Sequence, residues 1–419
     1  MNRPNVHLLD LPNEMLFNIL KKLDNVDVLH SLFGINNERL DSISREEIFS
    51  YTLNFTSNVH DTTIIDSMLG RFCNYILPRI HYNVKCLIVE PVSMKRILLA
   101  TPYPNLTELK IFNFQRDSSL HYFTDESSLR HIFKQQITKL GLINKDCEHA
   151  VGSLKDYTKR VYAHILTYLE NLEHLNVVET SNLTYPWLSI RYLPSNTFSS
   201  LTLTYLCINV NTFSDCLCLL DGRLKQLTTF IVKFSYIDKN SSTIHNLVGV
   251  LYLVYILNDL PNLKCFSLIC CCLIKEYDNK IVSLLRRMLY LEKLTLYLRI
   301  ANQDIFIDPI NLINEFSMCI PRLHSFKFYL SAENNRNDFV RYMSNNNIKQ
   351  NYVNIGYEEV SNIICAVDPT IYHIFTLPFE FAMLLFIGNI FPNIVFNYVI
   401  ELHGNIHNYP SSIGSTKLK

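Results

Sequence analysis

Residues 291–296 read LEKLTL, a spacing of apolar residues (apolar-x-x-apolar-x-apolar) that recurs along much of the chain. The last three positions alternate between apolar and other residues, and such alternation is typical of a short strand with one buried face. The starts of these stretches are roughly 22 to 36 residues apart, close to the period of a strand-and-return repeat. The other stretches begin at Val84, Leu106, Ile137, Leu172, Leu203, Leu227, Leu263 and Leu323.

Helical patterns precede several of these stretches. Apolar residues in 280–289 have helical spacing, and Asp308-Pro309 supplies a cap and a first-turn proline for a helix through Phe316. Each strand–helix unit leaves apolar faces that only its neighbours can cover. The pattern therefore predicts an α/β solenoid over residues 84–330, with an ordinary α/β domain as the alternative. The repeats resemble leucine-rich repeats, although the Asn that usually follows the strand motif is mostly missing.

The N-terminal segment predicts three short helices. Pro12 suits the first turn of a helix, where a missing N–H costs nothing. Asp27 can cap a second helix, and Leu40 and Ile43 mark a third. So short a segment cannot bury all of its apolar residues by itself, which favours a partner helix or groove. The first helix has one broad apolar face, made of Met15, Leu16, Ile19, Leu20 and Leu23.

These residues resemble the F-box. Leu8-x-x-Leu11-Pro12-x-Glu14-Met15 carries the likeness, and Asp27-Val28 and Leu32 continue it. The likeness covers residues 7–45, and Leu40 stands where many F-boxes have Trp. It implies docking onto the Skp-type adaptor of a cullin–RING ubiquitin ligase. The adaptor contacts that it implies are Leu8, Leu11, Pro12, Met15, Ile19, Leu20 and Leu32.

Together the patterns predict an α/β fold class. A small N-terminal three-helix F-box precedes an irregular leucine-rich-repeat-like solenoid, or horseshoe. The expected division is an F-box at 1–50, a connecting segment at 51–83, the solenoid at 84–330, and an irregular C-terminal segment with a polar tail at 331–419.

The strand pattern also suggests where a target protein binds. In each stretch, the residues on either side of the second apolar position point away from the core. At the ends of the array these residues are charged, but the centre is apolar, and an apolar centre with a polar rim is typical of an interaction site. The alternative is that another segment, such as the C-terminal one, covers the centre. The predicted target-binding residues are Tyr205, Cys207, Thr229 and Ile231.

Composition excludes several classes of protein. The formal net charge is zero and no basic stripe occurs, so nucleic-acid binding is not expected. The 12 cysteines lie singly or side by side without CxxC spacing, which favours reduced thiols in a cytoplasmic or nuclear protein. Residues 381–400 carry no charge, but they include Pro392 and several Asn, so a buried piece of the fold is favoured over a membrane span.

Sequence motifs for catalysis are missing. The chain has no HExxH, GxSxG, GxxxxGK or GxGxxG pattern, and His403 and His407 lack a third metal ligand. We therefore expect no enzyme activity, no metal and no cofactor. Three interpretations stay open: a ubiquitin ligase substrate receptor, a repeat scaffold acting elsewhere, and an enzyme with an unrecognised site.

Overall fold

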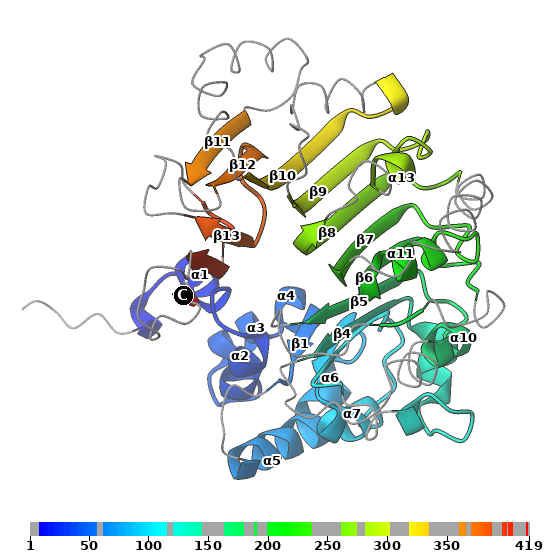
Figure 1. The fold of residues 1–419 in the computed structure, drawn as a ribbon. Helices are drawn as coiled ribbons and strands as arrows, with labels where there is room; N and C mark the ends of the chain where they lie inside the picture. The colour runs from blue at the N-terminus through cyan, green and yellow to red at the C-terminus, as the bar shows by residue number, and fades with distance from the viewer. Residues whose placement is uncertain are drawn as a thin grey trace, which may run out of the picture. The chain divides into compact units, whose positions relative to one another are not determined.

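The computed structural model of this chain divides into two compact units. Figure 1 shows its helices and strands in chain order by colour. Unit 1 comprises Met1–Pro186 and Thr197–Cys207, and unit 2 comprises Trp187–Asn196 and Ile208–Lys419. The structure describes residues 8–56, 62–114, 120–144, 163–179, 188–190, 199–236, 261–274, 281–301, 318–334, 360–365, 370–387, 396–399, 401–404 and 416–417.

Unit 1 begins with the three short helices that the sequence predicts, together with η1 before them and α4 after them, which it does not predict. The predicted cap of the second helix was wrong: the side chain of Asp24, rather than Asp27, accepts a hydrogen bond from the N–H of Val26 at 2.9 Å. Asn37 caps the third helix through the N–H of Leu40, at 3.1 Å. These elements are η1 (Leu8–Asp10), α1 (Asn13–Leu20), α2 (Asn25–Leu32), α3 (Glu38–Ser44) and α4 (Glu47–Tyr51).

The rest of unit 1 alternates strands with helical returns. Its parallel strands are hydrogen-bonded in chain order, and the start of β6 pairs with β5. The strands are β1 (Thr52–Asn54), β2 (Cys86–Val89), β3 (Glu108–Phe112), β4 (Lys139–Asn144), β5 (His174–Glu179) and β6 (Tyr205–Thr212). The helices are α5 (Thr62–Arg71), η2 (Phe72–Ile76), α6 (Leu77–Ile80), α7 (Pro91–Leu98), η3 (Leu120–Tyr122), η4 (Ile132–Gln136) and α10 (His164–Tyr168).

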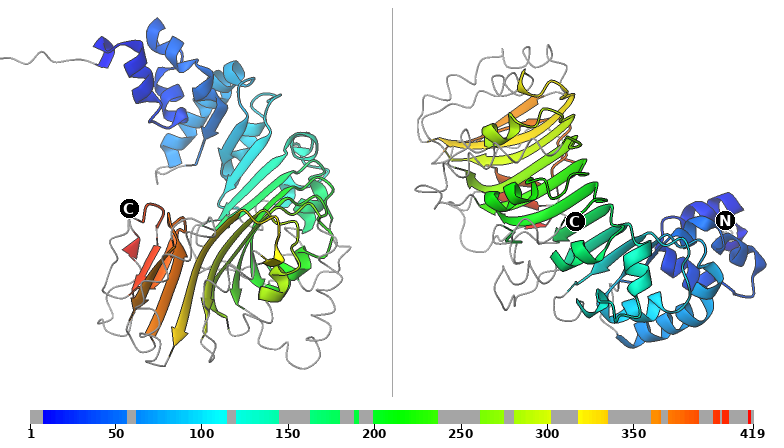
Figure 2. Two further views of the ribbon diagram at one scale, coloured as in Figure 1. Left: turned by 90° about the horizontal axis from the view of Figure 1, so that it is seen from above. Right: turned by 90° about the vertical axis from the view of Figure 1, so that its right-hand side faces the viewer.

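Unit 2 continues the same strand–return pattern. Figure 2 shows its parallel strands side by side in chain order. The strands are the rest of β6, β7 (Thr229–Tyr236), β8 (Cys265–Ile274), β9 (Lys293–Ile300) and β10 (Ser325–Asn334). The helices whose bounds lie in the described returns are α11 (Phe213–Leu219) and α13 (Ser283–Leu285). Helix α13 is shorter than the predicted helix at 280–289, and the predicted helix at 308–316 lies outside the described residues.

Every predicted repeat motif coincides with a strand. Each strand from β2 to β10 begins two residues after the first apolar residue of its motif, as at Leu106 for β3. Burial alternates strictly along β3 and β6, as predicted, but not along β2 or β9. The core residues Leu206, Phe230, Phe266 and Leu294 are all buried. The α/β class and the repeat pattern of largely parallel strands are therefore confirmed.

One hydrogen-bond arrangement recurs where the strands start. A single carbonyl of one repeat accepts from two successive N–H groups of the next repeat. In unit 1, Thr107 O accepts from Thr138 N and Lys139 N, both at 3.0 Å. In unit 2, Lys264 O accepts from Glu292 N at 2.7 Å and from Lys293 N at 2.9 Å. The repeats therefore share one backbone geometry although their sequences differ.

The strand array ends in an antiparallel pair. Strand β10 pairs antiparallel with β12 (Thr370–Thr376), and β12 pairs antiparallel with β11 (Val360–Cys365). A second sheet contains β13 (Met383–Ile387), β14 (Glu401–Gly404) and β15 (Thr416–Lys417). Strands thus form within 331–419, which the sequence predicts to be irregular. Among the described residues, no helix is long and apolar enough to cross a membrane.

Candidate functional site

Helix α1 buries only part of its broad apolar face. Leu16 and Leu20 are 0% and 5% exposed and belong to the core. Met15, Ile19 and Leu23 are 52%, 41% and 52% exposed. Residues four apart on a helix lie on the same side, so Met15 and Ile19 form an apolar stripe that faces solvent. Leu23 lies in the turn after α1, so we call Met15 and Ile19 the α1 stripe.

The other predicted adaptor contacts differ in exposure. Pro12 is exposed, and Leu11 and Leu32 are half-buried. The side chain of Leu8 lies outside the described residues. Leu20 packs inside this unit, so in this structure it supports the surface from beneath and does not form part of it.

The N-terminal helices pack on the residues that follow them in unit 1. The side-chain amide of Asn25 donates to the carbonyl of Thr52, the first residue of β1, at 2.9 Å. Arg71 donates to the carbonyl of Phe33 at 2.9 Å. Gly34 has a positive φ of 71°, and a Cβ there would lie 2.5 Å from the hydroxyl of Tyr75. Contacts of their own side chains and backbone therefore fix the helices to the first strand and its return helix.

Arg39 is a residue of this region that the sequence pattern did not indicate. It lies on α3, and its guanidinium donates to the carbonyls of Leu9, at 2.7 Å, and Leu11. It also donates to the side-chain oxygen of Asn13 at 2.5 Å. A lone Arg in a polar stretch carries no local signal, because its acceptors lie 26 to 30 positions earlier in the chain.

The predicted target-binding residues divide between the two units. Tyr205 and Cys207 belong to unit 1, and Thr229 and Ile231 belong to unit 2. All four are half-buried, on the side of their strands away from the core. Their action as one site stays a prediction.

In unit 1, an aromatic ring of the neighbouring strand packs on Tyr205. The ring of Tyr205 stacks on that of His174 in the neighbouring strand, with centroids 5.3 Å apart. Burial raises the pKa of Tyr205, and it raises the pKa of the Cys207 thiol to about 11. Cys207 is therefore a neutral thiol near pH 7, which suits a contact surface better than a nucleophile.

Nearer the N-terminus of unit 1, the side of the strands that points away from the core carries an ion pair. Lys110 Nζ lies 3.1 Å from Glu108 Oε1. Gly141 lies opposite Lys110 on the next strand, and a Cβ there would lie 3.0 Å from Lys110 Cγ. The glycine thus leaves room for the Lys110 side chain to lie flat on the sheet. The pair gives this part of the face no excess charge.

In unit 2, the chain's own C-terminal part covers the outward side of β9 and β10. Tyr297 and Tyr329 point away from the repeat core, yet they are 1% and 0% exposed. Lys327 Nζ lies 2.5 Å from Glu380 Oε2, which ties the cover to β10. We call the residues that bury these tyrosines the C-terminal cover, namely Phe375, Phe379, Phe381 and Leu384.

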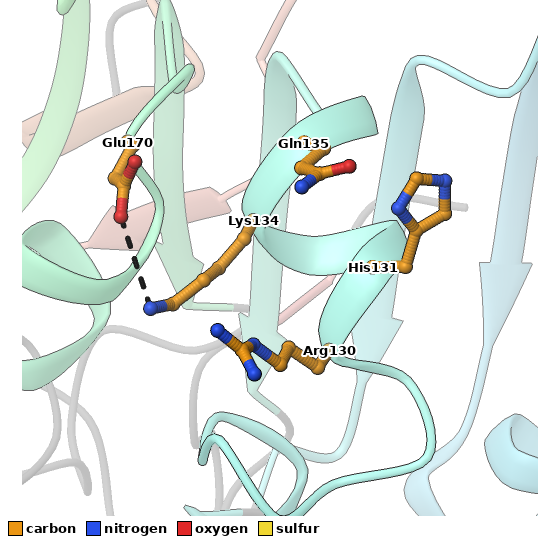
Figure 3. Close-up of a pocket in the computed structure, with 5 residues that line it drawn as sticks. All are labelled: Arg130, His131, Lys134, Gln135 and Glu170. Carbon is orange, nitrogen blue, oxygen red and sulfur yellow. Dashed lines mark ion pairs between the residues drawn. The ribbon is translucent and has the colours of Figure 1, made fainter.

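An open pocket of about 270 Å³ lies beside η4 in unit 1 (Figure 3). Lys134 Nζ lies 3.0 Å from Asp125 Oδ1 and 3.8 Å from Glu170 Oε1, and Arg130 Nε lies 3.3 Å from Asp125 Oδ1. The hydrogen bond from Lys134 lowers the pKa of Asp125. Because carboxylates already partner the cationic groups, the pocket offers no excess charge to a ligand. Its lining residues are Arg130, His131, Lys134, Gln135 and Glu170.

No group of three or more His, Cys, Asp or Glu side chains within the described ranges could hold a metal ion. The cysteines found there are free thiols, and several of them are buried. Burial raises the pKa of Cys86 to about 11, so this thiol is also neutral near pH 7.

No protein-family model matches this sequence, and no curated protein matches it. Among solved structures, the chain is similar to a chain in the crystal structure of the Rad7 and Elc1 complex in yeast. The two are 14% identical with a TM-score of 0.35, and the match covers 75% of this chain and 86% of that chain. At this level of likeness, the assignment of surfaces depends on the residues of this chain alone.

Proposed function

We propose that this chain is a non-enzymatic substrate receptor of an SCF-type cullin–RING ubiquitin ligase. Its N-terminal helices bind a Skp-type adaptor, and its repeat strands bind a target protein. The proposed adaptor surface comprises Leu8, Leu11, Pro12, Met15, Ile19 and Leu32. Catalysis then takes place in other subunits of the ligase.

The α1 stripe is the observation that carries the proposal. Met15 and Ile19 remain exposed on a packed helix, next to a Leu-Pro start that resembles the F-box. An exposed apolar stripe on a helix is the kind of surface that a partner groove covers. The stripe stands on helices fixed by buried contacts, so a partner meets a preformed surface.

The direct test is adaptor binding by the full chain with Met15→Asp and Ile19→Asp together. Burying one such apolar side chain is worth about 1.5–3 kcal/mol, and each 1.4 kcal/mol is tenfold in affinity. The double variant should therefore bind a purified Skp-type adaptor at least about 100-fold more weakly, as measured by calorimetry.

A matched control makes the same chemical change elsewhere in unit 1. Val92 and Leu201 are 90% and 80% exposed, so Val92→Asp with Leu201→Asp also replaces two exposed apolar residues by aspartate. This control should bind the adaptor like the wild type. Equal weakening by both double variants would argue against a specific surface on α1.

The alternative function is a repeat-based interaction scaffold outside ubiquitination. Its supporting feature is the repeat array, which needs no adaptor in order to present a strand face. The wild-type chain separates the two functions. Binding to a Skp-type adaptor favours the receptor, whereas a folded chain that binds none favours the scaffold.

For the target surface, we propose Tyr205, Cys207, Thr229 and Ile231. Tyrosine on a half-buried apolar surface is a favoured anchor in protein interfaces. A Tyr205→Ala, Ile231→Asp variant should keep its fold and its adaptor binding but lose its target proteins in affinity purification with mass spectrometry. If the recovered proteins are unchanged, the target binds elsewhere.

A further inference from the structure

The start of α1 differs from the starts of the next two helices. The side chain of Asp24 caps α2 and that of Asn37 caps α3. The N-cap position of α1 is Pro12, which makes no side-chain capping hydrogen bond. A helix start without a capping side chain loses a contribution to its stability and tends to fray. Yet this start carries Leu11 and Pro12 of the proposed adaptor surface.

The guanidinium of Arg39 makes contacts on both sides of this start. On one side it donates to the backbone carbonyls of Leu9 and Leu11, and on the other to the side-chain oxygen of Asn13. A guanidinium presents several N–H donors in a fixed plane, so one side chain can hold three acceptors in a defined arrangement. A lysine ammonium on a flexible stem cannot reproduce that plane.

We infer that Arg39 is a positioning residue for the adaptor surface. It holds the backbone from Leu9 to Asn13 in the path that leads into α1. As a donor it does not satisfy the free N–H groups of the first turn, so it fixes the approach to the helix and does not cap it. Its role is indirect, because it acts on the residues that bind and is not itself assigned a contact. The inference rests on the proposed function for its consequence in binding, but the contacts themselves do not depend on that function.

Arg45 provides a matched control on the same helix. It lies at the C-cap of α3, and its Nε lies 2.8 Å from Asp41 Oδ2. Its guanidinium also lies 4.5 Å from the centroid of the Phe33 ring. Arg45→Ala therefore removes a guanidinium and its local contacts while it leaves the hydrogen bonds of Arg39 intact.

The first measurement is adaptor affinity of the full chain carrying Arg39→Ala, Arg39→Lys or Arg45→Ala. If loss of Arg39 leaves the segment in its binding path about a tenth of the time, the apparent affinity falls about tenfold. The adaptor affinity of the Arg39→Lys variant should lie between those of wild type and Arg39→Ala. The affinity of Arg45→Ala should stay within about twofold of wild type. An Arg39→Ala variant that binds like the wild type overturns the inference and leaves the proposed function intact.

The second measurement needs no adaptor. The N–H groups of Met15 and Leu16 donate to the carbonyl of Pro12 at 3.1 and 3.0 Å, so their hydrogen exchange reports on the first turn of α1. Exchange should be faster in Arg39→Ala than in wild type and unchanged in Arg45→Ala. If the wild-type chain binds no adaptor, the proposed function fails, and exchange still decides whether Arg39 holds this turn. Equal exchange in both variants overturns the inference.

Discussion

The α1 stripe and the C-terminal cover show two fates for apolar side chains that point away from a core. In unit 1, Met15 and Ile19 stay about half exposed. In unit 2, Tyr297 and Tyr329 also point outward, but Phe379 and Phe381 bury them. Exposure of the apolar side chains to water costs free energy in both regions. Only unit 2 supplies its own cover among the residues that the structure describes.

This difference separates structural from functional apolar surface. The outward tyrosines of unit 2 are part of the core, and their ring centroids lie 4.4 Å apart. The α1 stripe has no such cover within the described part of unit 1, and that makes it the better candidate for a partner. Changes in the two regions should therefore affect different measurements.

The largest expected effect is on stability, from Phe379→Ala in the C-terminal cover. Phe379 contacts the rings of Phe375 and Phe381, with centroids 5.2 and 5.4 Å away, and is 1% exposed. Removing a buried Phe side chain should lower the free energy of unfolding by about 3–5 kcal/mol, as measured by denaturant titration. Adaptor affinity should not change.

Tyr398→Ala is the control for that change, because Tyr398 belongs to the same unit but is 57% exposed. Its effect on the free energy of unfolding should stay within about 0.5 kcal/mol. If Phe379→Ala is tolerated equally well, the cover is dispensable and the contrast between the two regions disappears.

An intermediate effect is expected on adaptor binding, from Leu11→Ala with Pro12→Ala. Leu11 is half-buried and Pro12 is exposed, so the free energy of unfolding should change little. Loss of one buried leucine contact is worth about 1.5–3 kcal/mol, which weakens adaptor binding about tenfold or more. Undiminished binding of a purified adaptor would contradict the F-box assignment.

The smallest expected effect should be alike in both units, because it concerns contacts between repeats. The side-chain amide of Asn105 donates to the carbonyl of Tyr82 at 2.7 Å, and that of Asn262 donates to the carbonyl of Lys225 at 3.1 Å. Asn105→Ala and Asn262→Ala should each lower the free energy of unfolding by about 0.5–1.5 kcal/mol. A much larger loss in one unit would show that the repeats are not equivalent there.

These asparagines occupy a different place from the one expected of leucine-rich repeats. The Asn expected after the strand motif is mostly missing here. Asn105 and Asn262 instead lie directly before the motif and bond to the return segment of the preceding repeat. Each contact joins residues more than 20 positions apart, so no local pattern indicates it.

The sequence by itself determined the strands and their two faces. The spacing of apolar residues predicted each strand from β2 to β10, because alternation along a strand depends only on local backbone geometry. It also predicted short N-terminal helices with surplus apolar surface. Both conclusions follow from which residues lie near each other along the chain.

Only the tertiary structure decided which apolar side chains are covered. Leu20 and Ile19 are neighbours in one apolar run, yet the first is buried and the second is exposed. Phe379 covers Tyr329, and Arg39 donates to the carbonyl of Leu9. In both pairs the two residues are far apart in sequence. Burial depends on packing between distant segments, and the local sequence around a residue does not contain that information.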